Sequence, residues 1–62
     1  MTREEIKEKI LDDGNWSLAR HRFADLLIEN YPDVETLDFL WDLFKKTGNR
    51  YYRSLVDKIK II

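Results

Sequence analysis

The stretch Val34–Thr47, VETLDFLWDLFKKT, is the most apolar segment of the chain and decides its fold class. Its apolar residues recur at positions i, i+3, i+4 and i+7, which lie on one face of an α-helix. We assign to this buried face Val34, Leu37, Leu40, Trp41 and Phe44. The spacing therefore predicts a central helix around which the rest of the chain packs.

Both ends of this helix carry the residues that helix termini favour. Asp33 takes the N-cap position, where its carboxylate accepts hydrogen bonds from the first turn. Lys45 and Lys46 lie in the last turn, where the helix dipole favours positive charge. Gly48 then supplies the positive φ that commonly ends a helix. These signals predict a helix over residues 34–47.

Two further groups of side chains lie on other faces of the same helix. Phe39 and Leu43 form a second apolar patch, and an acidic stripe is formed by Glu35, Asp38 and Asp42. A helix that is apolar over most of its circumference is normally buried by more than one neighbour. The patch therefore either meets a second packing partner inside the fold or serves as a docking surface for another chain.

Two helices are predicted before the central one. Thr2 and Glu5 have the spacing of a capping box, which starts the first helix. Asn15 or Ser17 is expected to cap the second helix. We assign to the core face of the second helix Trp16, Ala19, Phe23, Leu26, Leu27 and Asn30.

A fourth helix follows the central one, with Asn49 as its expected N-cap. Its apolar face repeats at helical spacing over Tyr52, Leu55, Val56, Ile59 and Ile62. We expect Ile62 to pack on the core. The sequence thus predicts an all-α fold, a small compact bundle of four short helices with helix three central, at residues 3–13, 16–31, 34–47 and 50–61 of a single domain spanning 1–62.

Composition excludes several kinds of site. The chain has 62 residues and no cysteine, which excludes disulfides and thiolate metal sites. With one histidine, His21, a structural zinc site is not expected, and we expect no metal or cofactor. So short a chain builds a modest core, and self-association is a common supplement. A homodimer is therefore an alternative to a monomer.

Charge and hydropathy indicate where the protein acts. The net charge is −1, which gives no general attraction to nucleic acid or to an anionic membrane. No apolar run approaches the roughly 20 residues of a membrane span. The N-terminus, MTREEIKEK, lacks the apolar stretch of a secretory signal. We expect a soluble, intracellular protein of the cytoplasm.

No catalytic constellation is recognisable in the sequence. Two isolated glycines do not build a phosphate-binding loop. Ser17 lies four residues before His21, but no orienting acid accompanies the pair, and a catalytic triad needs all three roles. We therefore expect that the protein is not an enzyme.

The sequence favours a small non-catalytic protein–protein interaction module, such as an adaptor, an inhibitor or a regulatory subunit. Acidic and basic residues lie on separate surfaces, and Tyr, Trp and Arg, which dominate binding hot spots, are abundant. We expect the partner to be another protein, and a basic one fits the acidic stripe. The candidate partner-binding residues are Glu35, Asp38, Phe39, Asp42 and Leu43.

Nucleic-acid binding is the alternative. The central helix, the turn after it and the basic fourth helix have the outline of a helix-turn-helix, whose second helix enters the major groove. Phe44 stands where the crossing favours a small residue, and the acidic stripe would lie close to bound phosphates. These features place this interpretation second. Its candidate contacts are Arg20, Arg22, Arg50, Tyr51 and Arg53.

Overall fold

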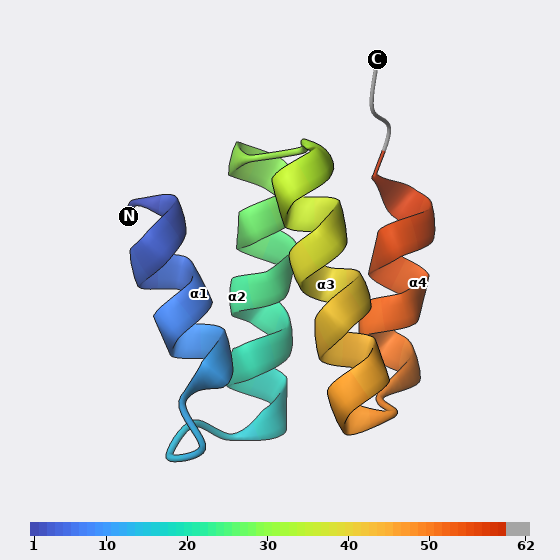
Figure 1. The fold of residues 1–62 in the computed structure, drawn as a ribbon. Coiled ribbons are helices and arrows are strands. Elements are labelled where there is room, and N and C mark those ends of the chain that lie inside the picture. Colours follow the sequence, from blue (N-terminus) through green and yellow to red (C-terminus); the bar gives the residue numbers. More distant parts are fainter. Residues whose placement is uncertain (60–62) are drawn as a thin grey trace.

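The computed structural model describes residues 1–59, and in this part of the chain four α-helices follow one another. They are α1 (Arg3–Leu11), α2 (Ser17–Asn30), α3 (Val34–Thr47) and α4 (Arg50–Lys58). Successive helices run in opposite directions, so that α1 with α2 and α3 with α4 form two antiparallel hairpins (Figure 1). The prediction of a small all-α bundle is confirmed.

Helix α2 joins the two hairpins. Helix α1 packs mainly on α2, and α3 packs mainly on α4, while α2 also contacts both α3 and α4. Helix α3 lies between α2 and α4 in Figure 1, but α2 is the helix that contacts all three others. No Cα atom of α1 lies within 8 Å of a Cα atom of α3, so a gap separates these two helices.

Every helix contributes two apolar side chains to one shared core. The spacing of three or four residues within each pair places both members on the same helical face. The buried apolar residues are Ile6 and Ile10 of α1, Ala24 and Leu27 of α2, Leu40 and Leu43 of α3, and Tyr52 and Leu55 of α4.

Side chains cap three of the helices as predicted: Thr2 caps α1, Asp33 caps α3 and Asn49 caps α4. Gly48 has a φ of 70°, a conformation that side chains disfavour, and ends α3. The predicted bounds of α3, residues 34–47, are therefore confirmed.

The start of α2 differs from the prediction. Neither Asn15 nor Ser17 caps this helix; Trp16 is the N-cap, with an extended backbone and no capping hydrogen bond from its side chain. Because Trp16 precedes the first helical residue, its side chain leaves the apolar face of α2 and is 83% exposed. Asn15 instead donates a hydrogen bond to the carbonyl of Lys9 near the end of α1. The assignment of Trp16 to the core was wrong.

Helices α1, α2 and α4 are shorter than predicted. Helix α1 ends at Leu11 rather than at residue 13, and α2 covers 17–30 rather than 16–31. In the core face of α2, Asn30 is exposed, and Ala24, which the predicted stripe left out, is fully buried. Helix α4 ends at Lys58 rather than at residue 61, and the expected packing of Ile62 lies outside the described residues.

The buried face of α3 is rotated relative to the predicted face. Leu40 and Leu43 are buried, whereas Val34 and Trp41 are 55% and 37% exposed. The helix is apolar over most of its circumference, so spacing alone did not distinguish between its faces. The packing of α2 and α4 decides the rotation, and the assignment of Val34 and Trp41 to the core was wrong.

Candidate functional site

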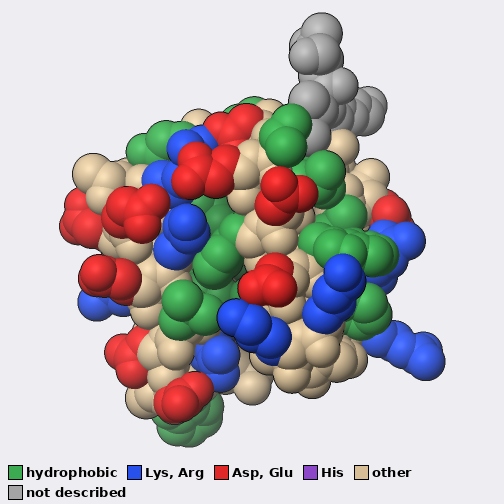
Figure 2. All heavy atoms as spheres, viewed as in Figure 1, with side chains coloured by type: hydrophobic (Ala, Val, Ile, Leu, Met, Phe, Trp, Pro, Cys, Tyr) green, Lys and Arg blue, Asp and Glu red, His purple; other side chains and the backbone are tan. Residues whose placement is uncertain are grey.

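The gap between α1 and α3 contains a groove lined by both apolar and charged side chains. Its volume is about 180 Å³, and it is lined by Leu11, Phe39, Asp42, Leu43 and Lys46. Hydrophobic side chains are visible along this gap, with charged side chains on either side (Figure 2). A cavity of about 150 Å³ is enough to hold benzene. The groove therefore has room for one large apolar side chain.

The apolar residues of the groove differ in exposure. Leu43 is buried and belongs to the core, while Phe39 is half-buried and packs against the core. Leu11, at the end of α1, is 53% exposed and is the most accessible apolar residue of the groove. Sequence reasoning missed Leu11 because no local pattern shows that the end of α1 lies across from α3.

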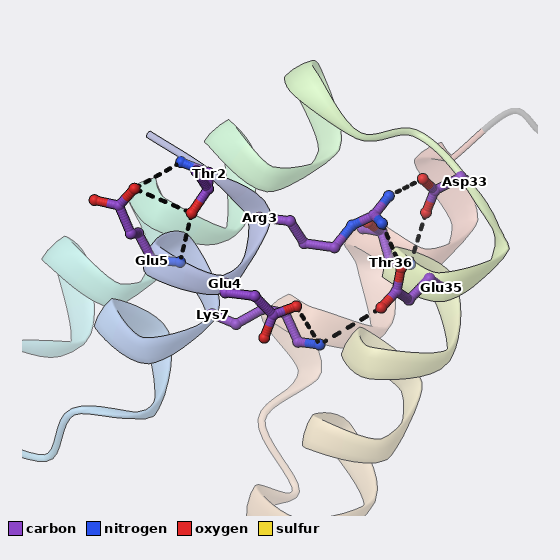
Figure 3. A network of polar contacts seen from close by, with 8 residues as sticks. All are labelled: Thr2, Arg3, Glu4, Glu5, Lys7, Asp33, Glu35 and Thr36. Carbon is purple, nitrogen blue, oxygen red and sulfur yellow. Dashed lines mark hydrogen bonds and ion pairs between the residues drawn. The ribbon is translucent and has the colours of Figure 1, made fainter.

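A network of charged side chains spans the gap at the N-terminal ends of α1 and α3 (Figure 3). Arg3 of α1 pairs with both Asp33 and Glu35, and Lys7 of α1 lies 3.9 Å from Glu35. The backbone N–H of Thr36 and, to a smaller extent, the guanidinium of Arg3 lower the pKa of Asp33. These side-chain contacts connect α1 to α3, although the backbones of the two helices do not pack against each other.

Ion pairs with residues of this chain engage two of the three acids in the predicted acidic stripe. Glu35 is engaged by two cations of α1, and Asp42 pairs with Lys46 of its own helix at 3.2 Å. Asp38 is exposed and has no ion pair among residues 1–59. Of the three acids, Asp38 is the one that the described residues leave available to a partner.

The predicted nucleic-acid residue Tyr51 makes contacts inside the fold. Its hydroxyl group donates to Asp25 of α2 at 2.7 Å, and its ring stacks on His21 at a centroid distance of 4.1 Å. Burial, followed by the hydrogen bond and charge of Asp25, raises the pKa of Tyr51 to about 12. Tyr51 therefore joins α4 to α2.

The four arginines of the nucleic-acid interpretation have different surroundings. Arg20 donates from Nε to the carbonyl oxygen of Ile10 at 2.7 Å. Arg53 pairs with Asp57 and lies over the ring of Trp41, 5.0 Å from its centroid. The remaining two, Arg22 and Arg50, are exposed.

The arrangement of α3 and α4 gives the helix-turn-helix interpretation little support. The two helices lie side by side and run in opposite directions (Figure 1). In a DNA-binding helix-turn-helix the helices cross at a steep angle instead. Helices α3 and α4 form an αα-hairpin.

A second, polar pocket of about 120 Å³ lies between the first turns of α2 and the turn that joins α3 to α4. Residues from segments about thirty positions apart line it, and sequence reasoning did not bring them together. They are Ser17, Arg20, His21, Thr47, Asn49 and Tyr52.

Comparison of the chain with known protein families, curated proteins and solved structures finds no match. No helix in residues 1–59 is long and apolar enough to cross a membrane. In the same residues, no group of three or more His, Asp or Glu side chains is placed to hold a metal ion.

Proposed function

We propose that the protein is a small non-catalytic protein–protein interaction module, whose partner inserts an apolar side chain into the groove between α1 and α3. The observation that carries this proposal is the groove itself. Leu11, Phe39 and Leu43 line a surface hollow between two helices whose backbones do not pack on each other. Apolar surface of this kind is a common feature of interaction sites.

The charges beside the groove define the chemistry of the partner. Asp42 and Lys46, which line the groove, already pair with each other. Asp38 lies one turn earlier on α3 and is exposed without an ion pair in the described part of the chain. The partner is therefore a segment of another protein that carries one large apolar residue with a Lys or Arg close to it. The partner's identity then decides whether the module acts as an adaptor, an inhibitor or a regulatory subunit.

The test requires substitutions that alter the groove and leave the core intact. Leu43 is unsuitable because it is buried, and Phe39 packs against the core. Leu11 and Leu18 form a matched pair, since they are 53% and 66% exposed and Leu11 alone of the two lines the groove. We propose Leu11→Glu as the test variant and Leu18→Glu as its control.

Short random peptides displayed on phage are selected on the unmodified protein and then measured on both variants. We expect the selected peptides to share an apolar residue with a nearby basic residue, and to bind Leu18→Glu but not Leu11→Glu. We expect Asp38→Asn to weaken them severalfold at most, because an exposed ion pair contributes about 0.2–1 kcal/mol. Circular dichroism of each variant confirms that it is folded.

Two outcomes contradict the proposal. One is selection of peptides that bind both leucine variants equally, since their site lies elsewhere. The other is a dimer in light scattering that Leu11→Glu dissociates, since the occupant of the groove is then a second copy of this chain.

A further inference from the structure

The polar pocket between α2 and the α3–α4 turn has a size suited to one small group. Its volume is about 120 Å³. Pockets for drug-sized ligands and cofactors measure roughly 300–1,000 Å³, so a molecule of that size does not fit. The pocket shares no lining residue with the groove between α1 and α3.

Arg20 provides the positive charge of this pocket. Its Nε atom donates to the carbonyl oxygen of Ile10, a contact that holds the guanidinium in place and leaves its two terminal amino groups for another acceptor. Arg20 has no ion pair with any acid among residues 1–59, and no carboxylate lines the pocket. A half-buried guanidinium without a counter-ion favours an anionic ligand.

The opposite wall of the pocket is held by a chain of hydrogen bonds. Asn49 accepts from the backbone N–H of Tyr51 through Oδ1, at 2.9 Å, so its Nδ2 atom is the donor toward Nε2 of His21, at 3.0 Å. The His21 ring accepts this hydrogen bond at Nε2. Stacking on Tyr51 fixes the plane of this ring. The wall is therefore ordered before any ligand arrives.

Two of the remaining lining residues add hydrogen-bond donors. Ser17 and Tyr52 contribute hydroxyl groups. Ser17 is also the first residue of α2, a helix end that no side chain caps. The first N–H groups of such a helix lack intrahelical partners, and the helix dipole makes this end positive. The hydrogen-bond donors and the positive charge of Arg20 both favour a negatively charged ligand.

We propose that this pocket binds a tetrahedral oxyanion of the phosphate class, either as inorganic phosphate or as the terminal group of a phosphomonoester. Arg20 supplies the charge and the N–H donors of its two terminal amino groups, and Ser17 supplies a hydroxyl donor. A phosphodiester backbone is disfavoured because the small pocket accommodates one terminal group rather than a continuous chain.

The test is a titration of the ¹⁵N-labelled protein with sodium phosphate, followed by NMR, against sodium chloride at equal ionic strength. We expect saturable shifts of the Ser17 and Asn49 amides and of the Arg20 Nε–H signal with phosphate alone. O-phosphoserine, titrated in parallel, distinguishes a phosphomonoester from free phosphate by its relative affinity. An oligonucleotide without terminal phosphates serves as the diester probe.

Two arginines of α2 provide a matched pair of variants. Arg20→Gln and Arg22→Gln remove the same charge from the same helix, but only Arg20 lines the pocket. We expect Arg20→Gln to weaken phosphate binding about tenfold or more, and Arg22→Gln to bind like the unmodified protein. Because Arg20→Gln also disturbs the contact with Ile10, Ser17→Ala is the second variant. It leaves that contact in place, and we expect it to weaken binding severalfold.

Three results would overturn the proposal. Equal shifts with phosphate and chloride indicate general salt effects. Equal weakening by the two arginine substitutions indicates a diffuse surface charge. Tighter binding of the diester oligonucleotide than of phosphate or O-phosphoserine indicates a nucleic-acid surface in place of a terminal-phosphate pocket.

Discussion

The hydroxyl group of Tyr51 lies 2.7 Å from both carboxylate oxygens of Asp25, and this contact joins α4 to α2. The ring of Tyr51 also stacks on His21, one helical turn earlier on α2. These contacts link the two hairpins, which the short segment between α2 and α3 joins covalently. The side chain of Tyr51 thus has a structural role within the fold.

Stability should fall at high pH through this contact. The pKa of Tyr51 is raised from 10.0 to about 12, first by burial and then by Asp25. The folded protein therefore holds this proton more tightly than the unfolded chain does. The stability that this tightly held proton contributes is fully present below pH 10 and is lost as the pH rises from 10 toward about 12. Urea unfolding across this range measures the decline.

The control for this pH dependence is Tyr51→Phe, which keeps the aromatic ring and removes the titrating hydroxyl. We expect its stability to be lower at neutral pH and to decline less steeply above pH 10. Burial also raises the pKa of Tyr52, so a smaller decline remains in the variant. An unchanged slope in Tyr51→Phe would show that Tyr51 does not contribute.

A pair of alanine substitutions tests the rotation of α3. Leu40 is fully buried, and Leu40→Ala is expected to cost about 2–5 kcal/mol. Val34 is 55% exposed, and Val34→Ala is expected to change the free energy of unfolding by about 0.5 kcal/mol or less. Urea unfolding of both variants provides the measurement. A large cost for Val34→Ala would show that the face predicted from the spacing, which includes Val34, is the buried one.

The exposure of Trp16 predicts that its side chain is dispensable for folding. Trp16 is 83% exposed, so Trp16→Ala should leave the free energy of unfolding within about 0.5 kcal/mol of the unmodified protein. Acrylamide should quench Trp16 more strongly than Trp41, which is 37% exposed; the variants Trp41→Phe and Trp16→Ala isolate the two signals. A decrease of several kcal/mol in the free energy of unfolding of Trp16→Ala would show that Trp16 packs in the core.

Thr36 offers a stabilising substitution. It is 1% exposed, and its hydroxyl group has no hydrogen-bond partner among the residues that the structure describes. An unsatisfied buried polar group costs about 1–3 kcal/mol. Thr36→Val replaces this hydroxyl with a methyl group, and we expect the unfolding midpoint in urea to rise.

Thr36→Ser is the matched control, because it keeps the hydroxyl and removes the methyl group. We expect it to be less stable than the unmodified protein. If Thr36→Val were the less stable of the two variants, the hydroxyl group would have to make a stabilising contact.

The candidate site was predicted in part from the sequence. Phe39, Asp42 and Leu43 were selected as candidate contacts, and all three line the groove. Leu11 and Lys46 complete the groove, but neither was selected, because the apposition of α1 and α3 is a long-range relationship. The polar pocket was missed for the same reason, since Arg20 and Asn49 lie on different hairpins.

The sequence by itself determined the four helices and those helix ends that side chains cap. Such caps depend on hydrogen bonds over about three residues, as between Asp33 and Thr36, and residue type is enough to identify them. The tertiary structure alone decided which face of α3 is buried, where Trp16 points and which residues meet Arg20. These features depend on how whole helices pack against one another, and a helix that is apolar on most of its circumference permits several packings with the same local pattern.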